Sequence, residues 1–196
     1  MDKIKIAIGA DGKGTTLKEI VSACKEGTLL AEVVLVFSSK EACPALDFAK
    51  EKGILIMTPS QGDLFSTLKM AQVNLICLAG YLKLIPKEII EAFPKAILNS
   101  HPAIDLVKFG GKGMYGTNVT RAVIASGEKI TGSTIHFVDE AFDTGDIIMQ
   151  SQVPVLSNDT PESLMERQLP IERQMYLEVI RQWIATSGNP QLGQKF

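Results

Sequence analysis

Short apolar runs rich in β-branched residues alternate with helical patterns through the first half of the chain. The β-type runs cover 4–10, 31–39 and 54–58, and the helical patterns between them cover 15–27 and 43–53. Strands that alternate with helices of this length form βαβ units, whose right-handed crossovers build a parallel sheet. The pattern therefore predicts an α/β fold with an open, mostly parallel, twisted sheet and helices on both faces.

The middle of the chain continues this pattern and contains its most apolar strand candidate, residues 73–80. A short helical piece at 86–93, a further strand at 95–100 and a glycine-ended helix at 118–127 follow. In such a sheet the strand order reverses beside the first strand, and ligands bind at the carboxyl ends of the strands there. We therefore expect the ends of strands one, four and five to face a common crevice.

The last third of the chain combines a hairpin with helical sequence. Residues 129–155 predict two strands joined across an acidic turn, and so short a connection requires antiparallel pairing. We expect this C-terminal antiparallel hairpin at an edge of the sheet. From Pro161 onward the apolar residues fit helical spacing if Pro170 bends or divides the element.

Composition and charge narrow the class of protein. The 196 residues, with 45% hydrophobic and 21% charged side chains, suit one globular domain that buries a full core. A net charge of -2 and a pI of about 5.8 provide no electrostatic footprint for nucleic acid or an anionic membrane. No apolar run approaches the ~20 residues that span a bilayer, and the N-terminus has no signal-peptide core. These features predict a cytoplasmic protein.

Cysteine and histidine usage gives no indication of a metal site. Cys24, Cys43 and Cys77 are odd in number, widely spaced and set among apolar neighbours, which is typical of buried reduced thiols. The two histidines, His101 and His136, lie 35 positions apart with no cysteine cluster nearby. We therefore expect no zinc.

The segment GADGKGTT, residues 9–16, joins the first predicted strand to the first predicted helix. Its glycines allow a tight turn, and free N–H groups at the start of a helix favour an anion such as phosphate. The spacing matches neither common nucleotide fingerprint. A plain turn capped by a threonine explains the same residues without a ligand.

The predicted strand at 95–100 ends in polar residues that could take part in a reaction. Asn99 can donate a hydrogen bond to an oxygen that becomes negative, and His101 can act as a general acid if one carboxylate of the acidic turn, 138–146, lies beside it. Such a set suits acyl transfer through a tetrahedral intermediate. Without chemistry, Asn99 and His101 would simply end a strand, and the acidic turn would be a solvated hairpin tip. His136 falls within an alternating strand, so we expect a structural role for it.

Five segments together resemble the folate-dependent formyltransferases. They are the glycine turn, LAGYLKLIP (78–86), ILNSHPA (97–103), FGGKGMYG (109–116) and GSTIHFVDEAFDTGDII (132–148), and the resemblance spans residues 4–184. It implies a Rossmann-like formyltransferase fold. It also implies transfer of the formyl group of a co-substrate, 10-formyltetrahydrofolate, to the amine of glycinamide ribonucleotide in purine synthesis, without a metal.

The resemblance also implies roles for individual residues. Asn99 would hold the formyl oxygen, His101 would donate the proton, and Asp143 would raise the pKa of His101. The ribonucleotide would contact Gly12, Gly14, Thr15, Thr16 and Glu172. The folate would contact Asn99 and two segments, namely Leu82, Lys83, Leu84 and Ile85, and Val138, Asp139, Glu140, Ala141, Phe142 and Asp143.

We expect one formyltransferase domain, residues 1–196, present as a monomer or homodimer. A half of about 1–94 would bind the nucleotide phosphate, and a half of about 95–186 would hold the folate and catalytic groups. The chain departs from the family pattern at Thr15–Thr16, at 104–107, which is one residue longer, and at Asn118, Thr120 and Arg173. The alternatives are a formyltetrahydrofolate hydrolase and a binding module without turnover. The glycine-rich 108–115 segment predicts a mobile lid over the substrate.

Overall fold

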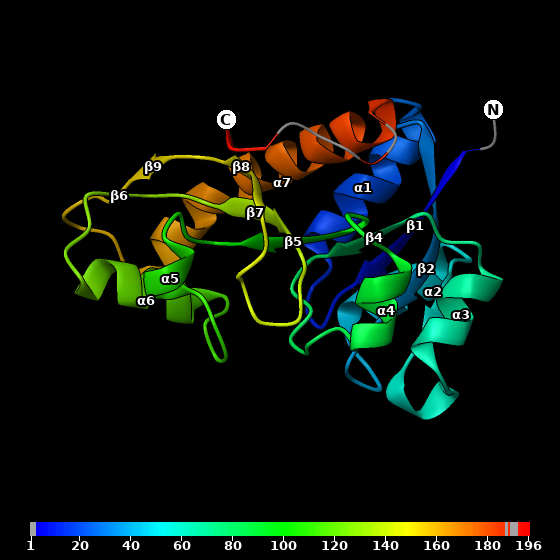
Figure 1. Ribbon diagram of the computed structural model, residues 1–196. Helices are drawn as coiled ribbons and strands as arrows, with labels where there is room; N and C mark the ends of the chain where they lie inside the picture. The colour runs from blue at the N-terminus through cyan, green and yellow to red at the C-terminus, as the bar shows by residue number, and fades with distance from the viewer. Residues whose placement is uncertain (1–2, 187, 189–191) are drawn as a thin grey trace. The chain divides into compact units, whose positions relative to one another are not determined.

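The computed structural model describes residues 3–186, 188 and 192–196 (Figure 1). The chain divides into two compact units, Met1–Leu98 and Asn99–Phe196. Among the described residues, the strands of the first unit pair in parallel, and the second unit combines parallel and antiparallel pairs with a small second sheet. The predicted α/β class is confirmed.

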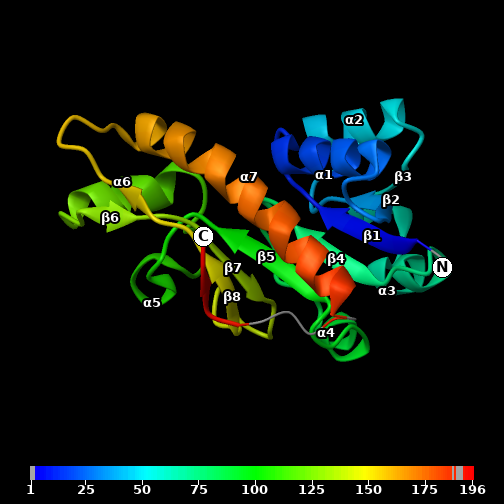
Figure 2. The same ribbon diagram turned by 90° about the horizontal axis from the view of Figure 1, so that it is seen from above.

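The first unit is a parallel α/β layer structure. Its strands are β1 (Ile4–Gly9), β2 (Ala31–Phe37), β3 (Leu55–Met57) and β4 (Leu75–Leu78), in the order β4-β1-β2-β3. Its helices are α1 (Thr15–Glu26), α2 (Pro44–Glu51), α3 (Leu64–Met70) and α4 (Lys87–Ala92), with a short 3-10 turn, η1 (Pro59–Gln61). The chain steps outward from β1 to β3 and then returns to β4, so right-handed crossovers place α1 and α2 on the face opposite α3 (Figure 2).

The carboxyl ends of β1 and β4 lie side by side, as predicted. The Ala79 N–H donates to the Gly9 carbonyl at 2.9 Å, so the chains leave both strands at the same point. A Cβ at Gly9 would lie 2.7 Å from the Phe37 ring and 2.9 Å from Leu78. A side chain at this crowded strand end would require Phe37 or Leu78 to shift, so glycine is the residue that fits without rearrangement.

The second unit contains the predicted hairpin. Its strands are β5 (Ile97–His101), β7 (Thr134–Phe137), β8 (Ile147–Gln150) and β10 (Gln194–Lys195), in the order β10-β8-β7-β5. β7 and β8 pair antiparallel. One strand that the sequence pattern did not predict, β10, pairs in parallel with β8 and therefore lies outside the hairpin. The second sheet pairs β6 (Ile130–Thr131) with β9 (Val153–Pro154).

The described part of this unit also contains the helices α5 (Leu106–Phe109), α6 (Thr117–Ala125) and α7 (Pro161–Ala185). Thr160 and Ser163 form a capping box that starts α7. The helix continues through Pro170, so of the two expected effects of this proline, bending or division, division does not occur. Buried Leu164 before the proline and Tyr176 after it pack both parts of the helix into the core. Among the described residues, no helix combines the length and the apolar character needed to span a membrane.

Candidate functional site

Strand β5 positions the two polar residues of the Asn-Ser-His stretch. Successive side chains of a strand point to opposite faces, so Asn99 and His101 share one face and Ser100 takes the other. Ser100 Oγ donates to Glu172 Oε1 of α7 at 2.6 Å, whereas Asn99 and His101 both contact the loop between β7 and β8. The strand therefore presents an amide and an imidazole together.

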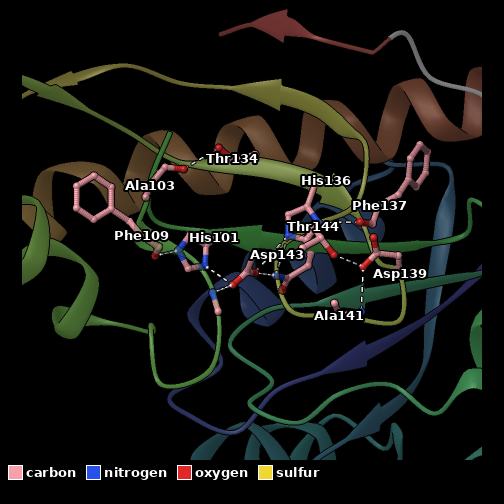
Figure 3. Close-up of polar contacts among 12 residues, drawn as sticks. His101, Ala103, Phe109, Thr134, His136, Phe137, Asp139, Ala141, Asp143 and Thr144 are labelled. Atoms are coloured by element: carbon pink, nitrogen blue, oxygen red, sulfur yellow. Dashed lines mark hydrogen bonds and ion pairs between the residues drawn. The ribbon is translucent and has the colours of Figure 1, made fainter. Parts of the chain in front are cut away.

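Asp143 lies at the centre of the site, between two histidines (Figure 3). Its Oδ2 is 3.4 Å from His101 Nδ1, and its Oδ1 is 3.5 Å from His136 Nε2. Asn99 Nδ2 donates to Oδ1 at 3.2 Å, and the Gly111 N–H donates to Oδ2 at 2.9 Å. The structure thus brings together Asn99, His101 and Asp143, three residues singled out from the sequence.

The local backbone explains how a hairpin loop delivers this carboxylate. Asp139 Oδ1 accepts hydrogen bonds from the Ala141 N–H at 3.1 Å and from Thr144 Oγ1 at 2.6 Å, which folds the loop on itself. Asp143 adopts a left-handed conformation, with φ of 58°, which aspartate tolerates better than most residues. A Cβ at Gly145 would lie 1.9 Å from the Phe137 carbonyl oxygen, so the loop packs tightly onto β7. Asp143 is therefore not part of a solvated tip, and its side chain is 8% exposed.

The second ring nitrogen of His101 also faces an acceptor. Nε2 lies 2.8 Å from the carbonyl oxygen of Phe109, the last residue of α5, and the His101 residue is 3% exposed. A carbonyl and a carboxylate can only accept hydrogen bonds. The imidazolium, with a proton on each nitrogen, is thus the form of His101 that donates to both neighbours.

The electrostatic balance keeps Asp143 ionised. Burial by itself raises the pKa of this carboxyl, but the hydrogen bond and the charge of His101, with the hydrogen bond from the Gly111 N–H, hold the pKa well below its ordinary value. The site therefore contains a fixed negative charge between two rings.

His136 belongs to the site, although the sequence favoured a purely structural role. Its Nδ1 lies 2.7 Å from the Phe137 carbonyl oxygen, so we assign the proton of the neutral ring to Nδ1. Nε2 is then an acceptor, and it lies 3.1 Å from Asn99 Nδ2. All four residues of β7 are buried, so alternation could not reveal which face His136 takes; its position on the hairpin that carries Asp143 was the available signal.

Glu172 lies on α7, away from the face of β5 that presents Asn99 and His101. Its oxygens accept from Ser100 Oγ at 2.6 Å and from Ser133 Oγ at 3.0 Å. Burial raises the pKa of Glu172 above its ordinary value, against the hydrogen bonds from the two serines and the charges of His101 and Arg173. The predicted ribonucleotide contact is thus a buried carboxyl supported by two hydroxyls.

In the first unit, the glycine turn ends at an uncapped helix. Gly14 is the N-cap of α1, with φ of 67°, and no side chain caps the helix. The alternative of a threonine cap is therefore wrong. Thr15 is exposed, Thr16 is buried, and a Cβ at Gly14 would lie 3.0 Å from the Cβ of Ala45. The first N–H groups of a 12-residue helix remain available to an anion.

The two segments expected to contact folate differ in exposure. Leu82–Ile85 lies between β4 and α4, with Lys83 and Leu84 exposed and Ile85 buried. In 138–143, the Val138, Asp139, Phe142 and Asp143 side chains are partly buried, and Glu140 and Ala141 are exposed. Both segments are irregular backbone, whose N–H and C=O groups are not used up by a helix or strand ladder.

Two of the departures from the family pattern have structural roles. Asp105, in the longer 104–107 segment, caps α5: its Oδ1 accepts the Lys108 N–H at 2.9 Å. Thr120 is buried in α6, and its Oγ1 donates to the Pro161 carbonyl at 2.8 Å. The longer segment thus forms the helix whose last carbonyl meets His101.

In comparisons with known proteins, the chain is similar to formyltransferases. The family model described as formyl transferase matches residues 4–180. Phosphoribosylglycinamide formyltransferase, chloroplastic, of Arabidopsis thaliana is 43% identical over 187 residues, covering 90% of this chain and 64% of that protein. Phosphoribosylglycinamide formyltransferase of Haemophilus influenzae is 34% identical over 190 residues, covering 90% and 85%. The chain spans about three fifths of the length of the plant relatives.

Solved structures share the fold over nearly the whole chain. Glycinamide ribonucleotide transformylase 1 from Symbiobacterium toebii has a TM-score of 0.84 and 35% identity, covering 94% of this chain and 89% of that chain. A formyltetrahydrofolate deformylase from Pseudomonas syringae has a TM-score of 0.72 at 19% identity, covering 90% and 62%. The second likeness concerns the fold alone.

Proposed function

We propose that this chain, which belongs to the formyl transferase family, transfers a formyl group to the amine of phosphoribosylglycinamide in purine synthesis. The formyl donor that we infer is 10-formyltetrahydrofolate, and the products are the N-formyl ribonucleotide and tetrahydrofolate. The observation that carries this proposal is the grouping of Asn99 and His101 around the buried carboxylate of Asp143. The names of the relatives supply the substrate.

The proposed reaction needs no nucleophile from the protein. The substrate amine attacks the formyl carbon, a C–N bond forms, and the formyl oxygen becomes an oxyanion. Asn99 would donate its amide N–H to that oxygen, in place of one of its present acceptors, Asp143 Oδ1 or His136 Nε2. Such a donor stabilises the tetrahedral intermediate because its dipole is already oriented.

Collapse of the intermediate requires one proton at the leaving nitrogen. His101 would donate this proton from Nε2, in place of its contact with the Phe109 carbonyl, to N10 of the folate as the bond from N10 to the formyl carbon breaks. The attacking amine would release its own proton, which restores the imidazolium of His101. The ionised Asp143 beside Nδ1 stabilises the imidazolium that serves as the acid. In sum, the formyl group moves from N10 of the folate to the substrate amine, and N10 receives a proton in its place.

Substrate binding would use the residues that the resemblance singles out. We propose that Gly12, Gly14, Thr15 and Thr16 hold the ribonucleotide phosphate at the uncapped start of α1, and that Glu172 serves the same substrate. Leu82–Ile85 and 138–143 would contact the folate through backbone groups. The N-terminal half would thus be the phosphate-binding half of a single domain, and the C-terminal half would carry the chemistry.

A two-substrate assay tests this function. The purified chain is mixed with 10-formyltetrahydrofolate and phosphoribosylglycinamide, and the N-formyl product is followed by mass spectrometry. His101→Ala should lower kcat by about 10²- to 10⁴-fold, the usual contribution of a general acid. Absence of product from the wild-type chain would reject the proposal. Release of formate without the amine would identify a hydrolase instead.

A further inference from the structure

A buried carboxylate in the first unit lies outside the chemistry described above. Asp11 follows β1 directly and is 2% exposed. Its Oδ1 accepts from Ser38 Oγ and from the Ser39 N–H, and its Oδ2 accepts from Ser39 Oγ and from the Leu82 N–H, each at 2.7 Å. An ionised carboxylate has about four acceptor positions. Four donors therefore satisfy this buried group.

These donors come from two different strand ends. Ser38 and Ser39 follow β2, and Leu82 follows β4, so one side chain links the ends of three adjacent strands. The backbone of Asp11 supports the same arrangement, because its N–H donates to the Gly80 carbonyl at 3.1 Å. Gly80 has a left-handed φ of 78°, which turns the chain away from β4 immediately before Leu82.

The segment Leu82–Ile85 is held at both ends. It lies outside any helix or strand, so its backbone has no ladder to fix its position. Asp11 holds its first N–H, and Ile85 anchors its last residue in the core at 4% exposure. Between these two points Lys83 and Leu84 are exposed. The segment is thus anchored at both ends and exposed in the middle, where a ligand could reach it.

We propose that Asp11 is a positioning residue for the folate: by accepting the Leu82 N–H, it holds Leu82–Ile85 in the conformation whose backbone binds the pterin ring. This inference rests on the proposed function, which assigns that segment to the folate. Asp11 itself does not contact the reacting atoms. Its effect is on the fraction of molecules in which the segment is ready to bind.

This fraction determines the size of the expected effect. The apparent Kd equals the intrinsic Kd divided by the fraction of binding-competent molecules. If loss of the hydrogen bond leaves about one molecule in ten with the segment in place, the Kd for the folate rises about tenfold.

The phosphate turn has supports of its own, so the effect should be selective. The Ala45 N–H donates to the Gly12 carbonyl at 3.1 Å, and the Lys18 N–H donates to the Gly14 carbonyl at 3.0 Å. Neither bond involves the Asp11 side chain. Loss of the carboxylate should therefore leave the affinity for phosphoribosylglycinamide within about twofold.

Asp11→Asn is the variant that tests the hydrogen bond at constant shape. The new amide has one oxygen where the carboxylate had two. We expect that oxygen to stay on the side of the buried Ser38 hydroxyl and the Ser39 N–H, which places the NH₂ group opposite the Leu82 N–H, where two donors repel. Ser38→Ala is the matched control. It removes one hydroxyl from the same carboxylate and leaves the bond to Leu82 intact.

Two measurements are made on the whole chain. Calorimetry gives the Kd of tetrahydrofolate and of phosphoribosylglycinamide, and amide hydrogen exchange reports on the Leu82 N–H. In D11N we expect the Leu82 N–H to lose its protection from exchange and the Kd of tetrahydrofolate to rise about tenfold, with the Kd of phosphoribosylglycinamide nearly unchanged. In S38A we expect the protection and both Kd values of the wild type. The proposal would be overturned if D11N lost affinity for both ligands equally, or if S38A showed the same losses as D11N. Either result would mean that Asp11 only stabilises the fold.

The wild-type chain supplies a test that needs no variant to fold. Its Leu82 N–H should exchange more slowly than those of Lys83 and Leu84, and equal exchange rates would contradict the hydrogen bond. Failure of the wild-type chain to bind tetrahydrofolate would reject the proposed function itself. Binding by the wild-type chain with an unchanged Kd in D11N, despite free exchange at Leu82, would reject only the role of Asp11.

Discussion

The carbonyl oxygen of Phe109 lies 2.8 Å from Nε2 of His101, so the last residue of a four-residue helix orients the proposed acid. The same helix is followed by Gly111, whose N–H donates to Asp143. The longer 104–107 segment, which departs from the family pattern, is thus connected to both members of the acid pair. Changes in α5 should therefore be detectable in the chemistry.

Removing the cap of α5 should affect stability and rate together. Asp105→Ala deletes the acceptor of the Lys108 N–H and should lower the free energy of unfolding by about 1 kcal/mol. We expect a severalfold lower kcat, because the Phe109 carbonyl loses its fixed position. Asp105→Asn retains a capping oxygen and should restore both values. Denaturant unfolding and steady-state kinetics provide the test, and a kcat for D105A equal to wild type would separate α5 from the site.

Asp143 should stabilise the fold in a pH-dependent way. Its pKa in the folded chain lies below the unfolded value of about 3.9, so the folded state binds the proton more weakly. The stabilisation is therefore present above about pH 4 and is lost as the pH falls further. Thermal unfolding of wild type and Asp143→Asn at pH 3 to 6 should show a Tm difference that is constant at the upper end and narrows below pH 4. A difference that widens in acid would contradict the assignment.

Glu172 should show the opposite sign. Burial raises its pKa in the folded chain above the unfolded value of about 4.3, so the folded state binds the proton more tightly. Its contribution is most favourable below about pH 4 and is lost as the pH rises. The Tm of Glu172→Gln relative to wild type should thus increase between pH 4 and 7. A constant difference over this range would show that Glu172 titrates as it does in the unfolded chain.

His136 should act through Asn99. His136→Ala removes the acceptor 3.1 Å from Asn99 Nδ2, and the loss of one hydrogen bond of about 1 kcal/mol corresponds to roughly a fivefold lower kcat. The KM for phosphoribosylglycinamide should change little. His136→Gln, which offers an amide oxygen, should recover part of the rate. Wild-type kcat in H136A would return His136 to the purely structural role that its strand position had indicated.

Hydrophobic periodicity alone determined most of the fold. The β1-to-β5 series, α1, α2 and the β7–β8 hairpin follow from local patterns, because a buried strand is a short continuous apolar run and a helix buries one face with period 3.6. Local signals failed where burial overrides them. Pro170 breaks a helix in isolation, yet α7 continues through it because apolar residues on both sides pack into the core. The strand β10 has two residues and acquires its conformation by pairing with β8.

The chain itself also determined the chemical content of the site: an amide and an imidazole at a strand end, a carboxylate-rich turn and a glycine turn before a helix. Only the tertiary structure decided which groups meet. Asp139 turns to its own loop while Asp143 reaches His101, His136 joins them, and Asp11 binds Leu82, 71 positions away. Local sequence sets backbone preference over a few residues, whereas these contacts depend on loop conformation and on strand pairing between distant segments, and that pairing exists only once the chain is folded.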